Sequence, residues 1–177
     1  MSEKNACFLG LINPKSPQNV GNVLRAAGCF GATGIFYTGQ RYLHASKFVS
    51  DTRDNHERIP LVHCDSLQEV APPQTEMVAI ELVEGATPLM NFQHPARAFY
   101  VFGPEDGSLS QSVIDACRHV VYVPTTGCLN LSATVNVVLY DRLAKSQSAD
   151  FSIELIRNSR DTNNRLAVAE SHPLKST

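Results

Sequence analysis

Short apolar runs recur along the chain, separated by polar stretches that carry many of the Gly and Pro residues. The runs are nearly continuous rather than alternating, which is typical of strands buried on both faces of a parallel sheet. Six such strands are predicted, at residues 7–12, 34–38, 59–64, 77–82, 98–102 and 120–123.

Apolar residues at helical spacing occupy the intervals between these strands. In the longest predicted helix, residues 132–145, the side chains of Val135, Val138 and Leu139 share one face. Strand and helix therefore alternate, which predicts an α/β fold with a mostly parallel sheet and flanking helices. The other helices are predicted at residues 20–30, 66–70, 110–117 and 151–169, with a turn at 88–92.

The chain has 177 residues, which suits one domain over residues 1–147 and an appendage over residues 148–177. The appendage holds the last predicted helix and a polar tail. No apolar run approaches the roughly 20 residues that a membrane-spanning helix needs. The first residues lead directly into an apolar run that is too short and too early for a signal peptide. We therefore expect a soluble, cytoplasmic protein.

The composition argues against several kinds of site and partner. The five cysteines are scattered and include no Cys-x-x-Cys pair, so neither a disulfide framework nor a zinc site is expected. This usage fits a reducing compartment. The formal net charge of −2 argues against a protein that coats nucleic acid by bulk electrostatics. It leaves open a local basic patch, assembled within one chain or across a dimer.

The segment after the first predicted strand carries the pattern Asn19-x-Gly21-x-x-x-Arg25. Asn19 is predicted to cap the helix that follows, and Gly21 lets a ligand or another backbone approach closely. We expect Arg25 to lie on the side of this helix that shares a pocket with the cap. The same pattern also fits an ordinary capped helix with a surface Arg.

Two further segments follow predicted strands, where ligands bind in parallel sheets. Gly103 and Glu105 follow one strand, and this carboxylate could bind a basic side chain or a substrate hydroxyl; an ordinary acidic turn is the alternative. Asn130 and Ser132 are both candidate caps of the longest helix, whose N-terminus suits an anionic ligand group. A capped loop without ligand is equally compatible. GxGxxG and Walker patterns are absent, which disfavours a dinucleotide or nucleoside triphosphate site.

In order and spacing, the three segments together resemble the three motifs of the SpoU (TrmH) family of the SPOUT superfamily of RNA methyltransferases. The resemblance covers about residues 8–143. It implies a deep trefoil knot in the C-terminal part, S-adenosylmethionine held by the knot loops, and a homodimer in which one chain completes the other's pocket. The matching stretches are Asn19-x-Gly21-x-x-x-Arg25, Phe102-Gly103-Pro104-Glu105-x-Gly107-x-Leu109-Ser110 and Leu129-Asn130-Leu131-Ser132.

The resemblance also implies roles for single residues. Asn19 and Arg25 match the pair placed at the target ribose, Glu105 matches the second-motif carboxylate, and Asn130 matches the third-motif Asn. Where the family often has Ser, this chain has Cys128, and its 124–129 loop is shorter than in many members, so we expect a weaker polar contact there. The positions that match the cofactor site are Glu81, Gly103, Val123, Cys128, Leu129 and Ser132.

The implied reaction is an in-line transfer of a sulfonium methyl group to a ribose 2′-hydroxyl, which requires alignment of the two groups and no metal. Arg is commonly assigned as the general base in the family. A guanidinium stays protonated in proteins, which favours Arg25 as an electrostatic anchor for developing negative charge and for a phosphate, with Glu105 orienting Arg25 or the hydroxyl. A pH–rate profile separates the two roles.

The RNA target is less constrained. Arg41, Lys47 and Arg53 lie in a stretch that mixes basic and aromatic residues, which suits phosphate contacts and base stacking, although a solvated loop has the same composition. A compact substrate such as tRNA is favoured over rRNA. The alternatives from other classes are a non-catalytic RNA- or nucleotide-binding module on the same fold, and a hydrolase. The chain lacks the Gly-x-Ser-x-Gly elbow that many hydrolases of the α/β class carry.

Overall fold

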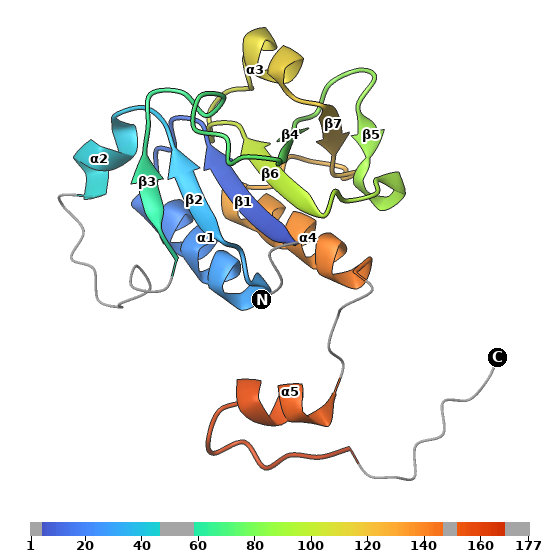
Figure 1. Cartoon of the computed structure of the whole chain (residues 1–177). Coiled ribbons are helices and arrows are strands. Elements are labelled where there is room, and N and C mark those ends of the chain that lie inside the picture. The colour runs from blue at the N-terminus through green and yellow to red at the C-terminus, as the bar shows by residue number, and fades with distance from the viewer. Residues whose placement is uncertain (1–4, 47–58, 147–151, 169–177) are drawn as a thin grey trace. The chain divides into compact units, whose positions relative to one another are not determined.

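The computed structural model describes residues 5–46, 59–146 and 152–168 (Figure 1). The chain divides into two compact units, residues 1–146 and residues 147–177. Each is described by itself.

In the first unit the described residues form a seven-stranded parallel sheet with the order β3-β2-β1-β6-β4-β7-β5. All six predicted strands are confirmed within a few residues at their ends. The short β5 was not predicted, because two residues, one of them Pro, carry no periodicity. The strands are β1 (Ala6–Leu11), β2 (Gly34–Tyr37), β3 (Leu61–His63), β4 (Glu76–Ile80), β5 (Thr87–Pro88), β6 (Arg97–Phe102) and β7 (His119–Tyr122).

Helices α1 (Pro17–Phe30) and α4 (Leu131–Ala144) pack against each other on one face of the sheet (Figure 1). Both were predicted, as was α3 (Gln111–Ala116). A 3-10 turn, η2 (Leu89–Asn91), lies where the sequence predicts a turn. The short α2 (Arg41–Ser46) was not predicted as a helix.

The prediction of a helix at residues 66–70 is wrong, because the chain forms a turn there. The Ser66 hydroxyl donates to Gln68 Oε1 at 3.0 Å and accepts from the Glu69 amide at 3.4 Å. Side chains of this type offer the backbone an alternative to helix, and five residues are too few for a helix to overcome it.

The cap of α1 also differs from the prediction. Ser16, and not Asn19, is the N-cap: its Oγ accepts a hydrogen bond from the Asn19 amide at 3.3 Å. The helix begins earlier than predicted, at Pro17, because Pro has a helical φ and the first turn needs no N–H donor from it. The Asn19 side chain is thereby left available for another contact.

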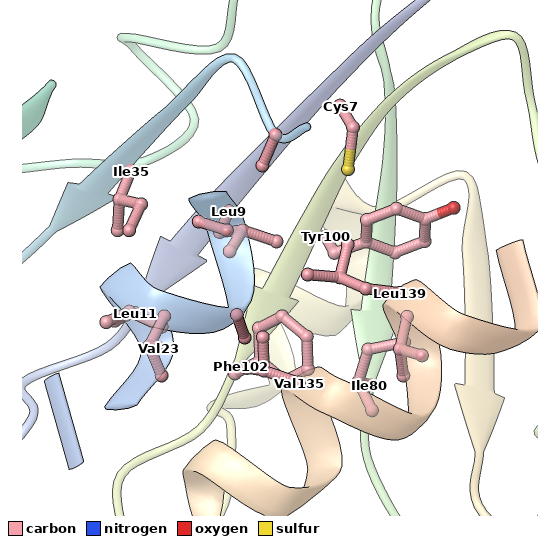
Figure 2. Close-up of a cluster of buried hydrophobic side chains, with 14 of the residues drawn as sticks. Cys7, Leu9, Leu11, Val23, Ile35, Ile80, Tyr100, Phe102, Val135 and Leu139 are labelled. Carbon is pink, nitrogen blue, oxygen red and sulfur yellow. The ribbon is translucent and has the colours of Figure 1, made fainter. Parts of the chain in front are cut away.

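Both faces of the sheet are buried, which explains the continuous apolar runs. On the helical face, Figure 2 shows Leu9, Tyr100 and Phe102 of the sheet gathered with Val23 of α1 and with α4. The intervening side chains of the same strands point to the other face. There the core is formed mainly by Leu67, Met77, Ala79, Phe99, Val101, Leu109 and Val113.

The described residues of the second unit form α5 (Ile153–Ser159), capped by the Ser152 hydroxyl, which accepts from the Leu155 amide at 3.2 Å. A helix was predicted over residues 151–169. It is confirmed for these seven residues only, the described chain beyond Arg160 is not helical, and residues 151 and 169 lie outside the described ranges. Across the described ranges, no helix is long and apolar enough to cross a membrane.

Candidate active site

A pocket of about 230 Å³ lies at the carboxyl ends of β4, β6 and β7. This is the edge at which the sequence predicts a ligand site, because the loops that leave parallel strands meet there. Three segments form its walls, at residues 80–82, 102–107 and 122–134. The lining residues are Ile80, Glu81, Leu82, Phe102, Gly103, Pro104, Glu105, Gly107, Tyr122, Val123, Thr125, Gly127, Cys128, Leu129, Leu131 and Thr134.

Five of the six residues predicted to hold a cofactor line this pocket, namely Glu81, Gly103, Val123, Cys128 and Leu129. The sixth, Ser132, does not. Its side chain is buried and its hydroxyl donates to Asn130 Oδ1 at 3.2 Å. The structure therefore gathers residues that are up to 48 positions apart in the sequence around one cavity. Tyr122, Thr125 and Thr134 also line it and carry no motif by which the sequence could have selected them.

The Glu81 carboxylate joins two walls of the pocket. Its Oε2 accepts from the Leu109 amide at 2.8 Å and its Oε1 accepts from the Leu82 amide at 2.9 Å. Gly103 lies against it: a Cβ there would stand 3.4 Å from Glu81 Oε2. Each carboxylate oxygen can accept more than one hydrogen bond, so Glu81 can also accept from a hydroxyl or an ammonium group in the pocket.

Asn130 caps α4 as predicted, and Ser132 does not. Asn130 Oδ1 accepts from the Ala133 amide at 2.7 Å. Asn130 is not part of the pocket wall, although Leu129 and Leu131 on either side of it are. The N-terminus of α4 thus opens beside the pocket, where its partial positive charge favours an anionic group.

Glu105 holds together the first and second predicted segments. Its Oε1 accepts from the Ser16 amide at 3.0 Å and from Asn19 Nδ2 at 3.1 Å, and its Oε2 accepts from the Lys15 amide at 2.8 Å. Burial raises the pKa of Glu105, but these three hydrogen bonds outweigh it and hold the pKa below its usual range. An ionised carboxylate therefore clasps residues 15–19 at the edge of the pocket.

Arg25 lies apart from this cluster. It is exposed on α1, does not line the pocket, and has no hydrogen bond or ion pair among the described residues. The expectation that it shares a side of the helix with Asn19 is wrong, because six residues turn an α-helix by 600° and leave the two side chains about 120° apart. Within one chain, Glu105 orients the start of α1 at residues 15–19 and not Arg25.

Three charged residues stand next to Glu105. Asp106 accepts from Arg41 Nη1 and Nη2 at 2.9 Å each, and Lys15 Nζ lies 3.7 Å from Asp106 Oδ2. The bidentate hydrogen bond from Arg41 lowers the pKa of Asp106. Arg41 was predicted to contact RNA; Lys47 and Arg53, named with it, lie outside the described residues. Lys15 and Asp106 were not predicted, because only the fold brings them to Arg41.

No three His, Cys, Asp or Glu side chains converge as metal ligands in the part of the chain that the structure describes. The site instead offers an open cavity, a helix N-terminus and two carboxylates. Such a site can hold a small molecule that has polar and apolar parts and present it to a second substrate at the rim.

Comparison with known proteins places this geometry in context. The model of the SpoU rRNA Methylase family matches residues 6–140. A 23S rRNA (uridine(2479)-2′-O)-methyltransferase of Streptomyces viridochromogenes is 26% identical over 148 residues, covering 76% of this chain and 52% of that protein. The chain spans about half the length of the curated relatives it matches.

Solved structures share the fold. The SpoU methyltransferase AviRb from Streptomyces viridochromogenes, in complex with the cofactor AdoMet, aligns with a TM-score of 0.68 at 20% identity, over 85% of this chain and 61% of that one. A structure that addresses 2-OH methylation of C/U34 on tRNA aligns with a TM-score of 0.69 at 24% identity, over 82% of this chain and 93% of that one.

Proposed function

The chain belongs to the SpoU rRNA Methylase family, and from that premise we propose that it is an S-adenosylmethionine-dependent RNA methyltransferase acting on a ribose 2′-hydroxyl in the cytoplasm. One observation carries the proposal. The second- and third-motif loops form walls of a single pocket, and Glu105 of the second motif accepts hydrogen bonds from Ser16 and from Asn19 of the first motif at the pocket edge. Parts of all three family motifs thus meet around one site in this chain, with Arg25 as the exception.

The pocket fits the proposed cofactor. Ile80, Leu129 and Leu131 offer apolar contact, and Glu81 can accept hydrogen bonds from ribose hydroxyls or an ammonium group. The N-terminus of α4 suits a carboxylate. When bound, S-adenosylmethionine supplies an electrophilic methyl group on a sulfonium. A neighbour on the same fold was solved with AdoMet.

The residues at the rim are proposed to position the RNA ribose. Glu105 holds Asn19 through its Nδ2, and the amide oxygen of Asn19, which accepts no hydrogen bond from the described residues, can accept one from the ribose. Arg25 carries a guanidinium group, and we propose that it acts as a cation that stabilises developing negative charge on the ribose oxygen. Its own chain does not bring it to Asn19 and Glu105, which supports a site shared between two chains.

We propose a homodimer for this reason and for a second one. Val137, Tyr140 and Leu143 recur every three residues along α4 and are 38%, 64% and 40% exposed. This stripe is more apolar than a helix surface that faces water in a monomer, and a second copy would cover it. Analytical ultracentrifugation tests the proposal: a monomer at micromolar concentration contradicts it.

The sheet order supports a trefoil knot. After β4 the chain runs to the sheet edge as β5 and then returns to form β6 on the other side of β4. The later β7 enters between β4 and β5, inside the loop so formed, and α4 then contacts η2 of that loop. We propose that the C-terminal part of residues 6–144 threads this loop.

For the target we propose tRNA. The structure that addresses tRNA methylation is matched over 93% of its length, so nearly everything that this neighbour contains has a counterpart here. The rRNA-methylating relative is matched over 52% of its length. An rRNA target and a non-catalytic RNA-binding module on the same fold are the alternatives.

Calorimetry with S-adenosylmethionine is the first test, since no binding defeats the proposed function. Transfer of a labelled methyl group to unmodified tRNA, and to rRNA in parallel, is the second. Resistance of the product to alkaline cleavage at one nucleotide identifies a 2′-O-methyl group. Cofactor binding without transfer to either RNA supports the non-catalytic module.

A further inference from the structure

A charged cluster at the rim of the pocket is not used by the proposed chemistry. Asp106 lies between Glu105 and Gly107, which both line the pocket, and it binds Arg41 through two parallel hydrogen bonds of 2.9 Å. Lys15 Nζ is 3.7 Å from the same carboxylate. Two cations thus share one anion, which leaves the cluster with a net charge of +1.

The geometry leaves one side of Arg41 available. A carboxylate that bridges Nη1 and Nη2 occupies the end of the guanidinium, so Nε–H and the lateral Nη–H groups still point sideways. Arg41 makes no other hydrogen bond among the described residues, and its side chain is 31% exposed. A guanidinium in this state can hold a second oxyanion through its lateral pair of donors.

The backbone that carries Arg41 is also held in place. Gly39, two residues earlier, has a φ of 76° and lies so close to Asn13 that a Cβ would clash with the Asn13 amide oxygen. His63 Nε2 lies 3.1 Å from the Gly39 carbonyl oxygen. Arg41 therefore begins α2 from a turn packed on the loop after β1, and its side chain is fixed at the far end by Asp106.

We propose that Asp106 is a positioning residue that holds Arg41 at the pocket rim as a clamp for an RNA phosphodiester, with Lys15 as a second, more exposed cation. The inference rests on the proposed function. A ribose 2′-hydroxyl is attached next to the carbon that carries the 3′-phosphodiester, so any site that places this hydroxyl at the rim brings a phosphate to the rim too. Bidentate Arg contacts orient phosphate as well as attract it.

Replacing Asp106 shows whether it positions Arg41 or acts only through its charge, because the two roles predict opposite changes in RNA affinity. If charge alone mattered, Asp106→Asn would remove a negative group beside RNA and strengthen binding. If Asp106 positions Arg41, the same change frees the guanidinium and weakens binding. The exposed carboxylate of Asp106 is not part of the core, so the substitution leaves the fold intact.

The test measures binding of bulk unmodified tRNA across a salt series by the wild type, Asp106→Asn, Arg41→Ala and the double variant. The control is Asp115→Asn, the same chemical change at an exposed position of α3, where the carboxylate accepts from Gln111 and from no other described residue. We expect Asp106→Asn to weaken RNA binding by roughly threefold to tenfold, the size of one misplaced charge-assisted contact. The double variant should bind no more weakly than Arg41→Ala alone, and Asp106→Glu should recover part of the affinity.

Different results would overturn the Arg41 clamp and the proposed methyltransferase function. RNA binding by Asp106→Asn that equals or exceeds the wild type overturns the clamp, as do independent, multiplying effects of Asp106→Asn and Arg41→Ala. The KM for RNA should rise while kcat and the Kd for S-adenosylmethionine stay unchanged; a change confined to kcat overturns positioning of the phosphate. A wild type that binds neither S-adenosylmethionine nor tRNA defeats the proposed function itself, and the clamp with it.

Discussion

At the scale of single residues, Glu105 determines how the two loops beside the pocket meet. Three donors from residues 15–19 converge on its carboxylate, across 86 to 90 positions of sequence. One of them is the side chain of Asn19, which is free to reach Glu105 because Ser16 takes over the helix cap. The role of Glu105 is therefore to build the rim on which the proposed ribose site depends.

Glu105→Gln should lower the free energy of unfolding at neutral pH by about 1 kcal/mol, because a neutral amide accepts these hydrogen bonds less strongly and the site is partly exposed. The pKa of Glu105 is lowered in the folded state, so its contribution is complete above the ordinary value of 4.5 and is lost as pH falls through the folded pKa. Urea unfolding at neutral pH and near pH 3 measures this. The difference in unfolding free energy between the wild type and Glu105→Gln should disappear near pH 3. Glu69→Gln is the control: Glu69 is exposed, so this variant should be as stable as the wild type at both pH values.

Substitutions at Cys128 test the position at which this chain departs from the family pattern. It lines the pocket where the resemblance leads one to expect Ser. Cys128→Ser should tighten S-adenosylmethionine binding by roughly twofold to tenfold, the worth of one added hydrogen bond. Cys128→Ala is the matched control and should not tighten it. Equal affinities of all three proteins by calorimetry would show that the cofactor does not contact this side chain.

At the scale of elements, a partly buried polar network fastens α4 to the segment at residues 89–96. His94 Nδ1 lies 2.5 Å from the Tyr100 hydroxyl and His94 Nε2 lies 2.8 Å from Asp141 Oδ2. Arg142 of α4 and Lys145, which caps its C-terminus, donate to carbonyl oxygens of the same segment at 2.6 to 3.1 Å. α4 therefore stays attached at its C-terminal end while its N-terminus forms part of the pocket.

Burial lowers the pKa of His94, although Asp141 opposes the shift. The ring is thus neutral at neutral pH, and its Nε2–H donates to Asp141 while Nδ1 accepts from Tyr100. A His with a lowered folded pKa costs stability as pH falls below the unfolded value of 6.5, because only the unfolded chain gains the proton. Arg142 and Lys145 stand nearby, and their positive charges also oppose protonation of His94.

His94→Gln should therefore unfold more easily than the wild type at neutral pH and lose less stability between pH 7 and about pH 5. Urea unfolding across that range measures both effects. The control is His44→Gln, since His44 is exposed on α2. A His94→Gln protein that loses stability with pH as steeply as the wild type would show that His94 titrates normally.

At the scale of the whole molecule, the separation of Arg25 from Asn19 and Glu105 has a testable consequence. If each site takes Arg25 from one chain and Glu105 from the other, Arg25→Ala and Glu105→Ala are each inactive alone. Mixed after partial unfolding and refolding, they should recover about a quarter of wild-type activity, because half of the dimers are mixed and half of their sites are intact.

Methyl transfer to tRNA by the refolded mixture measures this complementation. Each variant refolded alone is the control and should stay inactive. No recovery, in a mixture shown by ultracentrifugation to contain dimers, would place Arg25 and Glu105 in sites of the same chain.

The local sequence pattern was sufficient to predict the class of fold and the edge of the sheet at which the candidate site lies. Continuous apolar runs predicted six of the seven strands, because burial on both faces demands apolar residues at every position. The motif loops were predicted at the carboxyl ends of strands, and in parallel strands these ends meet at one edge. Five of the six residues expected at the cofactor do line one pocket there.

Contacts between distant segments were decided only by the tertiary structure. The bonds of Glu105 to residues 15–19, of Arg41 to Asp106 and of His94 to Asp141 join positions 47 to 90 residues apart. No periodicity records such pairs, because each partner satisfies its local pattern with or without the other. The position of Arg25 is a further example. The motif gives the number of residues between Asn19 and Arg25, but the turn of the helix and the proposed second chain determine where the charge of Arg25 acts.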